Sequence, residues 1–322
     1  MPRGFCVRAR VSTLATKKEG AAEWRGHHER GSRPLLRIMV YLSLRLGRRV
    51  TRGALYAIAG YYFLLARGAR RHIRRYLRLA LHREPAARDE FRLILNFART
   101  IHDRVYLING RDDLFEVTLE GEDLMRRQLH SGHGAFLLGA HLGSFEIMRT
   151  VGRRQPGLRV SMAMYEENAR KISAALAAIS PRETPDIVAL GHIDAMLKLR
   201  DRLERGIFVG MLADRTLGQE PMQAVEILGA RAHLPTGPLR AAAILRRPVI
   251  FMVGLYRGGN RYHAVFEPLA DFSATPVAER EAAIRQAVER YAGLIDRFCR
   301  SDPYNWFNFF DFWPLPGAAA EP

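Results

Sequence analysis

The sequence predicts an α/β protein: a mixed, mainly parallel sheet flanked by helices, preceded by a helical N-terminal region. From about residue 115 onward, short apolar runs alternate with helical stretches, which is the pattern of a sheet covered by helices. Before that point, apolar residues recur at helical spacing in an arginine-rich segment. The predicted regions are an irregular basic tail at 1–30, a basic helical region at 31–110 and an α/β domain at 111–316.

Basic charge is concentrated in the first third of the chain. Of 322 residues, 50 are basic and 33 acidic, which gives a net charge of +17. Residues 1–109 carry all of this excess, because residues 110–322 hold 26 basic and 26 acidic groups. A basic arm facing an anionic surface fits this distribution, and a nucleic-acid groove through the second region does not, so we expect no nucleic-acid partner. With only two cysteines, a disulfide scaffold is excluded.

The most apolar stretch lies inside the basic helical region. Fourteen uncharged residues, Gly53–Ala66, include several tyrosines and leucines and have arginines on both sides. A bilayer span needs about 20 apolar residues, whereas tyrosine and arginine favour the headgroup zone. This stretch therefore predicts an interfacial helix on a membrane surface, with a short span or a buried core helix as the alternatives. Residues 1–30 lack the apolar run of a secretory signal.

Two further helices are predicted in this region, over Leu35–Leu46 and Phe91–Ile108, with Pro85 as the break before the second. The predicted strands are Phe115–Glu120 at an edge, a buried Ala135–Ala140, Arg159–Tyr165, Asp186–Leu190, Gly206–Leu212, Ala224–Leu228, Pro248–Tyr256 and Tyr262–Glu267. The predicted helices among and after them are Phe145–Arg153, Asn168–Ile179, Ile193–Glu204, Pro238–Leu245 and Pro276–Cys299.

One segment combines a buried strand with acid–base residues. His141 directly follows the Ala135–Ala140 strand, then a glycine turn at Gly143 leads to a helix with Glu146 in its first turn. Ligands in α/β sheets bind at the carboxyl ends of strands. A carboxylate that bonds one imidazole nitrogen fixes the tautomer, so we expect His141 to be a general base and Glu146 its orienting partner. A hydrogen-bonded structural histidine beside a helical glutamate is the alternative.

This box and two later segments resemble a known family. His141–Glu146 is similar to the His-x4-Asp/Glu box of lysophospholipid acyltransferases, specifically the late acyltransferases of bacterial lipid A biosynthesis. Gly206–Arg215 resembles that branch's strand ending in Asp-Arg or Asp-Gln, and Val225–Pro238 resembles its Pro-Thr-Gly-Pro box. The likeness covers roughly residues 24 to 313.

The resemblance implies an O-acyltransferase on the cytoplasmic face of a bacterial inner membrane. Its donor would be an acyl carrier protein thioester and its acceptor a hydroxyl of a membrane lipid, with no cofactor and no metal. His141 would deprotonate the acceptor hydroxyl, and no acyl-enzyme is needed. Backbone amides around Gly143 and the cation of Arg215 are the oxyanion candidates. Asp214 would position Arg215 or the acceptor, or be a turn aspartate.

Three more residues are candidates for binding substrate. Arg149, one turn after Glu146, would bind a phosphate or pair with Glu146, and pairing is the favoured alternative. Arg231 and Thr236 would clamp an anionic head group, unless they serve only as a loop residue and a helix cap. The aromatic tail Tyr304–Trp313 would cap the core, cover the site, line an acyl tunnel or insert at the bilayer interface.

Two rival functions remain open from the sequence. The first is a thioesterase or lipid hydrolase, in which the same His141 and Glu146 act on water. The second is a non-enzymatic, basic peripheral membrane-binding protein. The neutral second region weighs against a role based on charge alone.

Overall fold

The computed structural model describes residues 33–166, 169–170, 173, 179, 186–192, 194–215 and 220–313. The tail predicted over 1–30 lies outside this range, as does most of the helix predicted over Asn168–Ile179. From Arg33 onward the chain forms one compact unit, in which the N-terminal helices pack against the sheet region.

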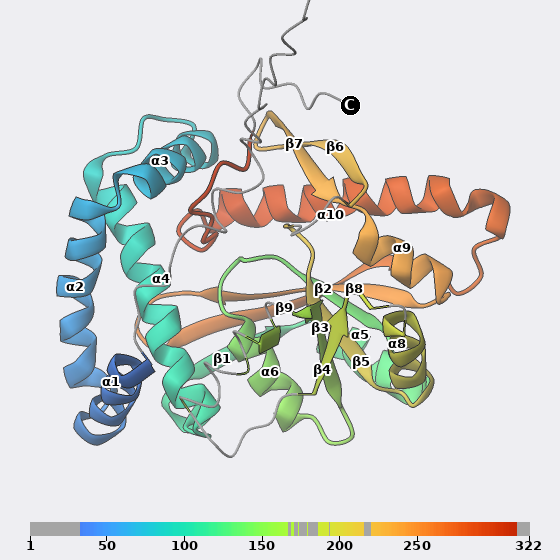
Figure 1. Cartoon of the computed structure of the whole chain (residues 1–322), viewed down its shortest axis with the longest axis horizontal. Helices are drawn as coiled ribbons and strands as arrows, with labels where there is room; N and C mark the ends of the chain where they lie inside the picture. Colours follow the sequence, from blue (N-terminus) through green and yellow to red (C-terminus); the bar gives the residue numbers. More distant parts are fainter. Residues whose placement is uncertain are drawn as a thin grey trace, which may run out of the picture. The chain divides into compact units, whose positions relative to one another are not determined.

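A seven-stranded mixed sheet forms the centre of this unit, in the order β1-β9-β8-β2-β5-β3-β4 (Figure 1). Only the β8–β9 pair is antiparallel within it, so the prediction of a mainly parallel sheet is confirmed. The strands are β1 Glu116–Glu120, β2 Phe136–Gly139, β3 Val160–Tyr165, β4 Ile187–Leu190, β5 Phe208–Leu212, β8 Pro248–Tyr256 and β9 Arg261–Asp271. The predicted edge strand is β1 and the predicted buried strand is β2, which lies between β8 and β5.

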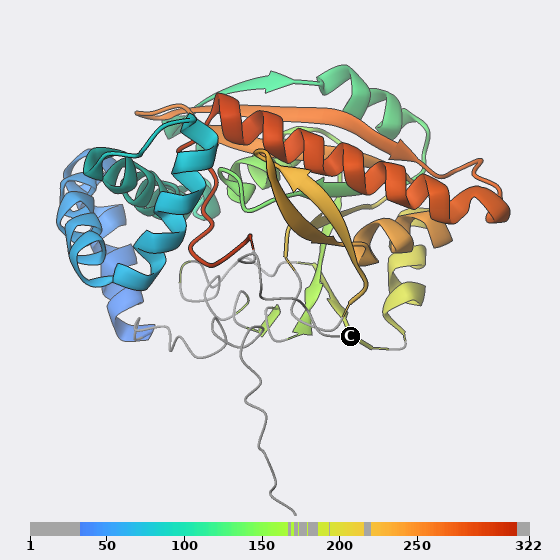
Figure 2. The same ribbon diagram turned by 90° about the horizontal axis from the view of Figure 1, so that it is seen from above.

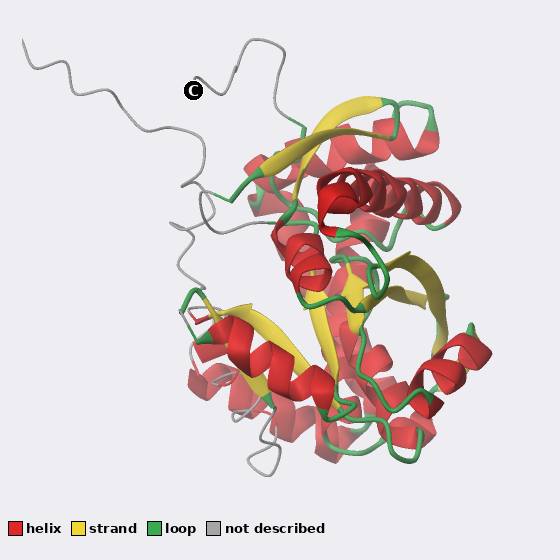
Figure 3. Ribbon diagram, turned by 90° about the vertical axis from the view of Figure 1, so that its right-hand side faces the viewer, coloured by secondary structure: helices red, strands yellow, loops and turns green. Residues whose placement is uncertain are grey.

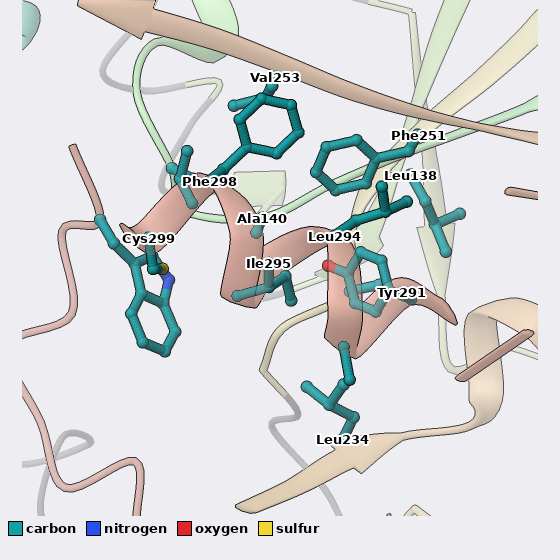
Figure 4. Close-up of a cluster of buried hydrophobic side chains, with 14 of the residues drawn as sticks. Leu138, Ala140, Leu234, Phe251, Val253, Tyr291, Leu294, Ile295, Phe298 and Cys299 are labelled. Carbon is teal, nitrogen blue, oxygen red and sulfur yellow. The ribbon is translucent and has the colours of Figure 1, made fainter. Parts of the chain in front are cut away.

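Helix α10, Arg280–Ser301, covers one face of the sheet (Figure 2). Successive residues of a strand point to opposite faces, so alternate side chains meet α10. Phe251 and Val253 of β8 share a core with Tyr291 and Phe298 of α10 (Figure 4). The Phe251 and Phe298 rings stack with centroids 5.6 Å apart. The antiparallel hairpin β6 Met222–Ile227 and β7 Ala230–Pro235 lies against the same helix.

The other sheet face carries the helices α5, Glu122–His130, and α6, Phe145–Arg154. Ile250 and Met252, the intervening residues of β8, pack in a second core with Ile147 of α6 and Met125 of α5. Helical layers therefore enclose the sheet from both sides (Figure 3). The remaining helices of this region that the structure describes are α8 Ala195–Glu204 and α9 Gly237–Ile244, with short 3₁₀ turns at Asp112–Leu114 and Val277–Glu279.

The N-terminal helices are α1 Arg33–Leu46, α2 Arg48–Leu65, α3 Arg67–Leu81 and α4 Ala87–Ile108. The break predicted at Pro85 is confirmed, because it separates α3 from α4. Helix α4 contributes side chains to both cores, with Leu93 in one and Tyr106 in the other. Within the described residues, no helix combines the length and the apolar character that crossing a membrane requires.

A buried ion pair fastens α2 to α4. The Arg48 guanidinium donates two hydrogen bonds of 2.8 Å to the carboxylate of Asp103, which is fully buried. The hydroxyl of Tyr262, on β9, donates a third bond of 2.8 Å to Asp103. These bonds tie the helical region to the sheet.

One strand and one α-helix of the sheet region were missing from the sequence prediction. Strand β7 contains Arg231 and His233 at alternate positions, so its apolar content is too low to stand out, and only pairing with β6 defines it. Helix α5 is short and mostly polar, with Met125 as its one fully buried side chain. Short elements of this kind are fixed by their neighbours rather than by periodicity.

Candidate active site

The sheet order brings a histidine and an aspartate together. Strands β2 and β5 are parallel neighbours, with Gly139 opposite Leu212. His141 and Asp214 each follow two residues later, so equal offsets from paired residues place them side by side. The ring Nδ1 of His141 lies 2.8 Å from Asp214 Oδ1, and the His141 backbone N–H donates to Oδ2 at 3.1 Å.

This contact defines the tautomer of the histidine. Burial by itself raises the pKa of Asp214, but the charge and hydrogen bonds of His141, aided by Arg215, outweigh it and hold the pKa well below its usual range. An ionised carboxylate only accepts hydrogen bonds, so Nδ1 of His141 carries a proton, and in a neutral ring the free lone pair therefore lies on Nε2. The His141 side chain is 37% exposed whereas that of Asp214 is 1% exposed. The imidazole therefore presents a basic edge to solvent and rests on a buried anion.

Glu146 does not make the contact that the sequence predicted. It lies in the first turn of α6 and is buried, but its carboxylate accepts hydrogen bonds from Arg149 at 2.8 Å and from Arg104 of α4 at 3.3 Å. Asp214 occupies the position beside the imidazole instead. The reason is topological: five residues of turn and helix turn Glu146 toward α4, whereas the β5 end abuts His141 directly. The favoured pairing of Arg149 with Glu146 is confirmed.

Gly143 has a structural task in the turn after His141. Its φ of +71° lies in the left-handed region, and a Cβ there would stand 2.0 Å from the carbonyl oxygen of Gly254. Only glycine allows this approach of the turn to β8. The Gly143 N–H donates to the carbonyl of Asn305 at 2.8 Å, and the Ser144 N–H donates to Gly254 at 2.7 Å. Both amides are engaged within the fold, contrary to the prediction that they would bind an oxyanion.

Arg215 lies beside the pair. Its Nε stands 3.9 Å from Asp214, and one terminal nitrogen donates to the carbonyl of Phe307 at 2.9 Å. The guanidinium also packs over the ring of Phe310, 4.6 Å from its centroid. Among the described residues, Arg215 Nε has no hydrogen-bond partner although it is buried. This leaves Arg215 as the cation nearest to the carboxylate of the pair.

Arg231 and Thr236 are not brought together. Arg231 lies near the start of β7 and is exposed, whereas Thr236 is buried just after the strand ends. Five residues of extended chain separate them by about 17 Å. The Thr236 hydroxyl donates to the carbonyl of Pro221 and accepts a bond from Arg240, both at 3.1 Å. A joint clamp is therefore not formed, and Thr236 fixes a loop at the start of α9.

Two contributors to this site escaped the sequence analysis. Arg104 belongs to the helix predicted over Phe91–Ile108 but not to its apolar stripe, and nothing in its spacing connects it with Glu146. Trp306 belongs to the aromatic tail, where its indole N–H donates to Asp214 Oδ2 at 3.3 Å. A usable signal existed for Asp214 itself, because it follows its strand at the same offset as His141. The sequence does not reveal that the two strands are neighbours.

The fold is that of an α/β protein with a paired histidine and aspartate at the carboxyl end of a central parallel sheet, the place where such folds bind their ligands. The family model described as bacterial lipid A biosynthesis acyltransferase matches residues 35–313, and the chain belongs to that family. The match confirms the resemblance drawn from the His141, Asp214 and Pro235 segments. A comparison with curated proteins found no match. The family assigns this chain to the acyltransferases of lipid biosynthesis, which act on a lipid acceptor.

Proposed function

We propose that this protein transfers a fatty-acyl chain from an acyl carrier protein thioester to a hydroxyl of a membrane lipid, with His141 as general base. The observation that carries the proposal is the pairing of His141 Nδ1 with the buried carboxylate of Asp214, which leaves Nε2 on the exposed side of the ring. Family membership supports acyl transfer, and this pair supplies a means to activate a hydroxyl.

The chemistry balances without a covalent enzyme intermediate. His141 Nε2 takes the proton of the acceptor hydroxyl as its oxygen attacks the thioester carbonyl carbon. The tetrahedral intermediate then collapses, the C–S bond breaks, and the imidazolium returns its proton to the leaving sulfur. Arg215 is the proposed cation near the developing oxyanion, because the amides of Gly143 and Ser144 are already bonded.

Asp214 carries out the orienting role that the sequence assigned to Glu146. It contacts His141 at two points, the ring Nδ1 and the backbone N–H, and stabilises the positive charge that His141 acquires. Glu146 then has a different role in this proposal: it holds Arg104 and Arg149 beside the start of α6. Arginines held in place by a buried carboxylate suit recognition of a phosphate of the donor arm or of the lipid head group.

The N-terminal helices are proposed to rest on the membrane surface. Twelve of the 17 exposed large hydrophobic side chains in the described part of the chain lie on α1 and α2. They are Ile38, Tyr41, Leu42, Leu44, Leu46, Val50, Tyr56, Ile58, Tyr61, Tyr62, Leu64 and Leu65. Apolar patches of this extent, bordered by arginines, are typical of interfacial membrane binding. The basic charge of the same region also suits an acidic carrier protein.

The test of the transfer reaction uses membranes from a host that expresses the full chain, with a labelled acyl carrier protein thioester as donor. The wild type should form a labelled lipid, and His141→Ala should reduce its formation by at least about 10⁴-fold. His133→Ala is the matched control, since His133 is an exposed histidine eight residues earlier, and it should retain activity. Labelled free fatty acid as the sole His141-dependent product would instead establish the hydrolase.

The membrane proposal has its own test. Vesicles with anionic lipids should sediment the wild-type protein more strongly than zwitterionic vesicles, and Leu64→Glu with Leu65→Glu should weaken sedimentation. Leu197→Glu on α8 is the control, because Leu197 is 60% exposed on a separate helix. Equal binding by all three proteins would contradict docking through α2.

A further inference from the structure

The second oxygen of the Asp214 carboxylate has a partner of its own. Oδ1 faces the imidazole of His141, while Oδ2 accepts hydrogen bonds from the His141 backbone N–H and from the indole N–H of Trp306. An indole N–H only donates and an ionised carboxylate only accepts, so the two groups are matched in this contact. The side chain of Trp306 thus completes a linear set of contacts, Trp306 to Asp214 to His141.

The segment around Trp306 also holds the backbone of both site loops. The Phe307 N–H donates to the carbonyl of His141 at 3.0 Å, and the carbonyl of Asn305 accepts from Gly143 at 2.8 Å. The Phe307 carbonyl accepts from Arg215 at 2.9 Å. Residues 305–307 therefore contact the loop after β2 and the loop after β5 at the same time, on either side of the Asp214 carboxylate.

This segment is itself firmly held. The Asn305 amide accepts from the backbone N–H of Tyr256 at 2.8 Å and donates to the Tyr256 carbonyl at 3.1 Å. The Trp306 ring is fully buried and packs edge-on against Tyr76 of α3, with centroids 5.2 Å apart. It also contacts Trp313 at 5.7 Å. Because contacts with β8 and α3 fix the indole, the indole can determine the orientation of the Asp214 carboxylate.

We propose that Trp306 is a positioning residue for the acyl-transfer reaction, acting through Asp214 on His141. This inference rests on the proposed function, and it extends that function from a pair of residues to a set of three. With Oδ2 fixed by the indole and by the His141 backbone, rotation of the carboxylate is prevented and Oδ1 stays on the imidazole. Loss of the indole N–H allows the Asp214 carboxylate to rotate, which misaligns the imidazole of His141. The residues that bind the substrates are not changed.

The first test compares Trp306→Phe with Trp313→Phe in the full-length protein. Both changes remove an indole N–H from the same buried aromatic cluster, since Trp313 donates to the carbonyl of Ile227 at 3.2 Å. Trp306→Phe should lower kcat about tenfold with KM for both substrates unchanged, as removal of outer hydrogen-bond partners commonly does. Trp313→Phe should keep kcat within about twofold. Equal losses in the two variants, or a change confined to KM, would overturn the proposal.

A double-mutant cycle tests whether the effect passes through Asp214. In an Asp214→Asn background, Trp306→Phe should cost no further activity, because the carboxylate it positions is already gone. A full additional tenfold loss there would show that Trp306 acts by another route and would overturn the inference.

A third measurement does not depend on activity, or on whether the Trp306 variant folds. The chain has three tryptophans, so the ¹⁵N-labelled protein gives at most three indole N–H signals. Trp313→Phe assigns one of them. Asp214→Asn should shift one of the other two and leave the Trp313 signal in place, whereas unchanged signals would contradict the contact. If the wild type transfers no acyl group, the proposed function fails while this measurement still decides the Trp306–Asp214 bond.

Discussion

Two buried aspartates, one in the helical region and one in the sheet region, have similar surroundings and different consequences. Asp103 is fully buried, and burial raises the pKa of its carboxyl, but the neighbouring imidazole of His102, 3.9 Å away, and the hydrogen-bonded guanidinium of Arg48 outweigh burial and lower that pKa. Asp214 is also buried, with a lowered pKa for the corresponding reason and His141 as its main partner. Each carboxylate contacts one basic side chain and accepts a hydrogen bond from one aromatic side chain. These partners are Arg48 and Tyr262 for Asp103, and His141 and Trp306 for Asp214.

The difference lies in the partner. Arg48 keeps its proton at any physiological pH and its side chain is only 11% exposed, so the pair with Asp103 is a fixed link between α2 and α4. His141 offers an imidazole, a group that can accept or donate a proton where a guanidinium cannot, and its ring reaches solvent. A buried carboxylate beside a guanidinium therefore holds two helices together, whereas one beside a partly exposed imidazole can take part in the proton transfer that we propose for His141.

The largest expected effect separates the two aspartates by activity. Asp214→Asn replaces the anion with a neutral amide of the same shape, which no longer stabilises a charged imidazole. We expect kcat for acyl transfer to fall about 10³- to 10⁴-fold with KM little changed, measured by steady-state kinetics. Asp113→Asn, at an exposed aspartate, should retain wild-type kcat. A loss below tenfold in Asp214→Asn would remove Asp214 from the mechanism.

The next effect concerns stability. Asp103→Asn leaves the Arg48 guanidinium without its anion in a buried setting, so the free energy of unfolding should fall by about 3–5 kcal/mol, measured by urea denaturation. Activity per folded molecule should stay near wild type. Glu84→Gln breaks an exposed pair with Arg78 and should not change stability measurably. Equal stability of Asp103→Asn and the wild type would contradict the anchoring role.

A smaller effect is expected at Glu146, where the sequence predicted the orienting carboxylate. Because Glu146 bonds Arg104 and Arg149, Glu146→Gln should raise KM for the thioester or lipid more than it lowers kcat. Asp214→Asn should show the opposite split in the same assay. A fall in kcat as large as that of Asp214→Asn, with KM unchanged, would restore Glu146 as the orienting residue.

The smallest expected effect is a dependence of stability on acidity. An unfolded aspartate titrates at about pH 3.9, and the folded pKa of Asp103 lies lower. Below about pH 4 the unfolded chain therefore binds a proton that the folded chain does not, so stability falls as the pH falls through this window. Melting temperatures between pH 3 and 6 should decline toward acid in the wild type and less steeply in Asp103→Asn. Parallel curves would contradict the contribution of Asp103.

Much of the fold could be predicted from the sequence, since the strands of the central sheet have apolar runs of the right length. Ala135–Ala140 became the central strand β2, and Phe115–Glu120 became the edge strand β1. The short polar helix α5 and strand β7 could not be predicted, because their stability comes from the α6 layer and from the partner strand β6. His141 was identifiable by its place at a strand end. Its contacting carboxylate was not, because the sequence pointed to Glu146 and the structure has Asp214.

The sequence by itself determined the class of the fold, the family and the histidine of the candidate site, because these depend on local order: a buried strand, then His141, then a glycine turn. The tertiary structure alone decided which carboxylate lies beside that histidine. Asp214 lies 73 positions after His141 and contacts it because β2 and β5 pair in register. Trp306 belongs to the aromatic tail, 92 positions after Asp214, and contacts the same carboxylate. Pairing between distant strands is set by packing of the whole sheet, and no local pattern encodes it.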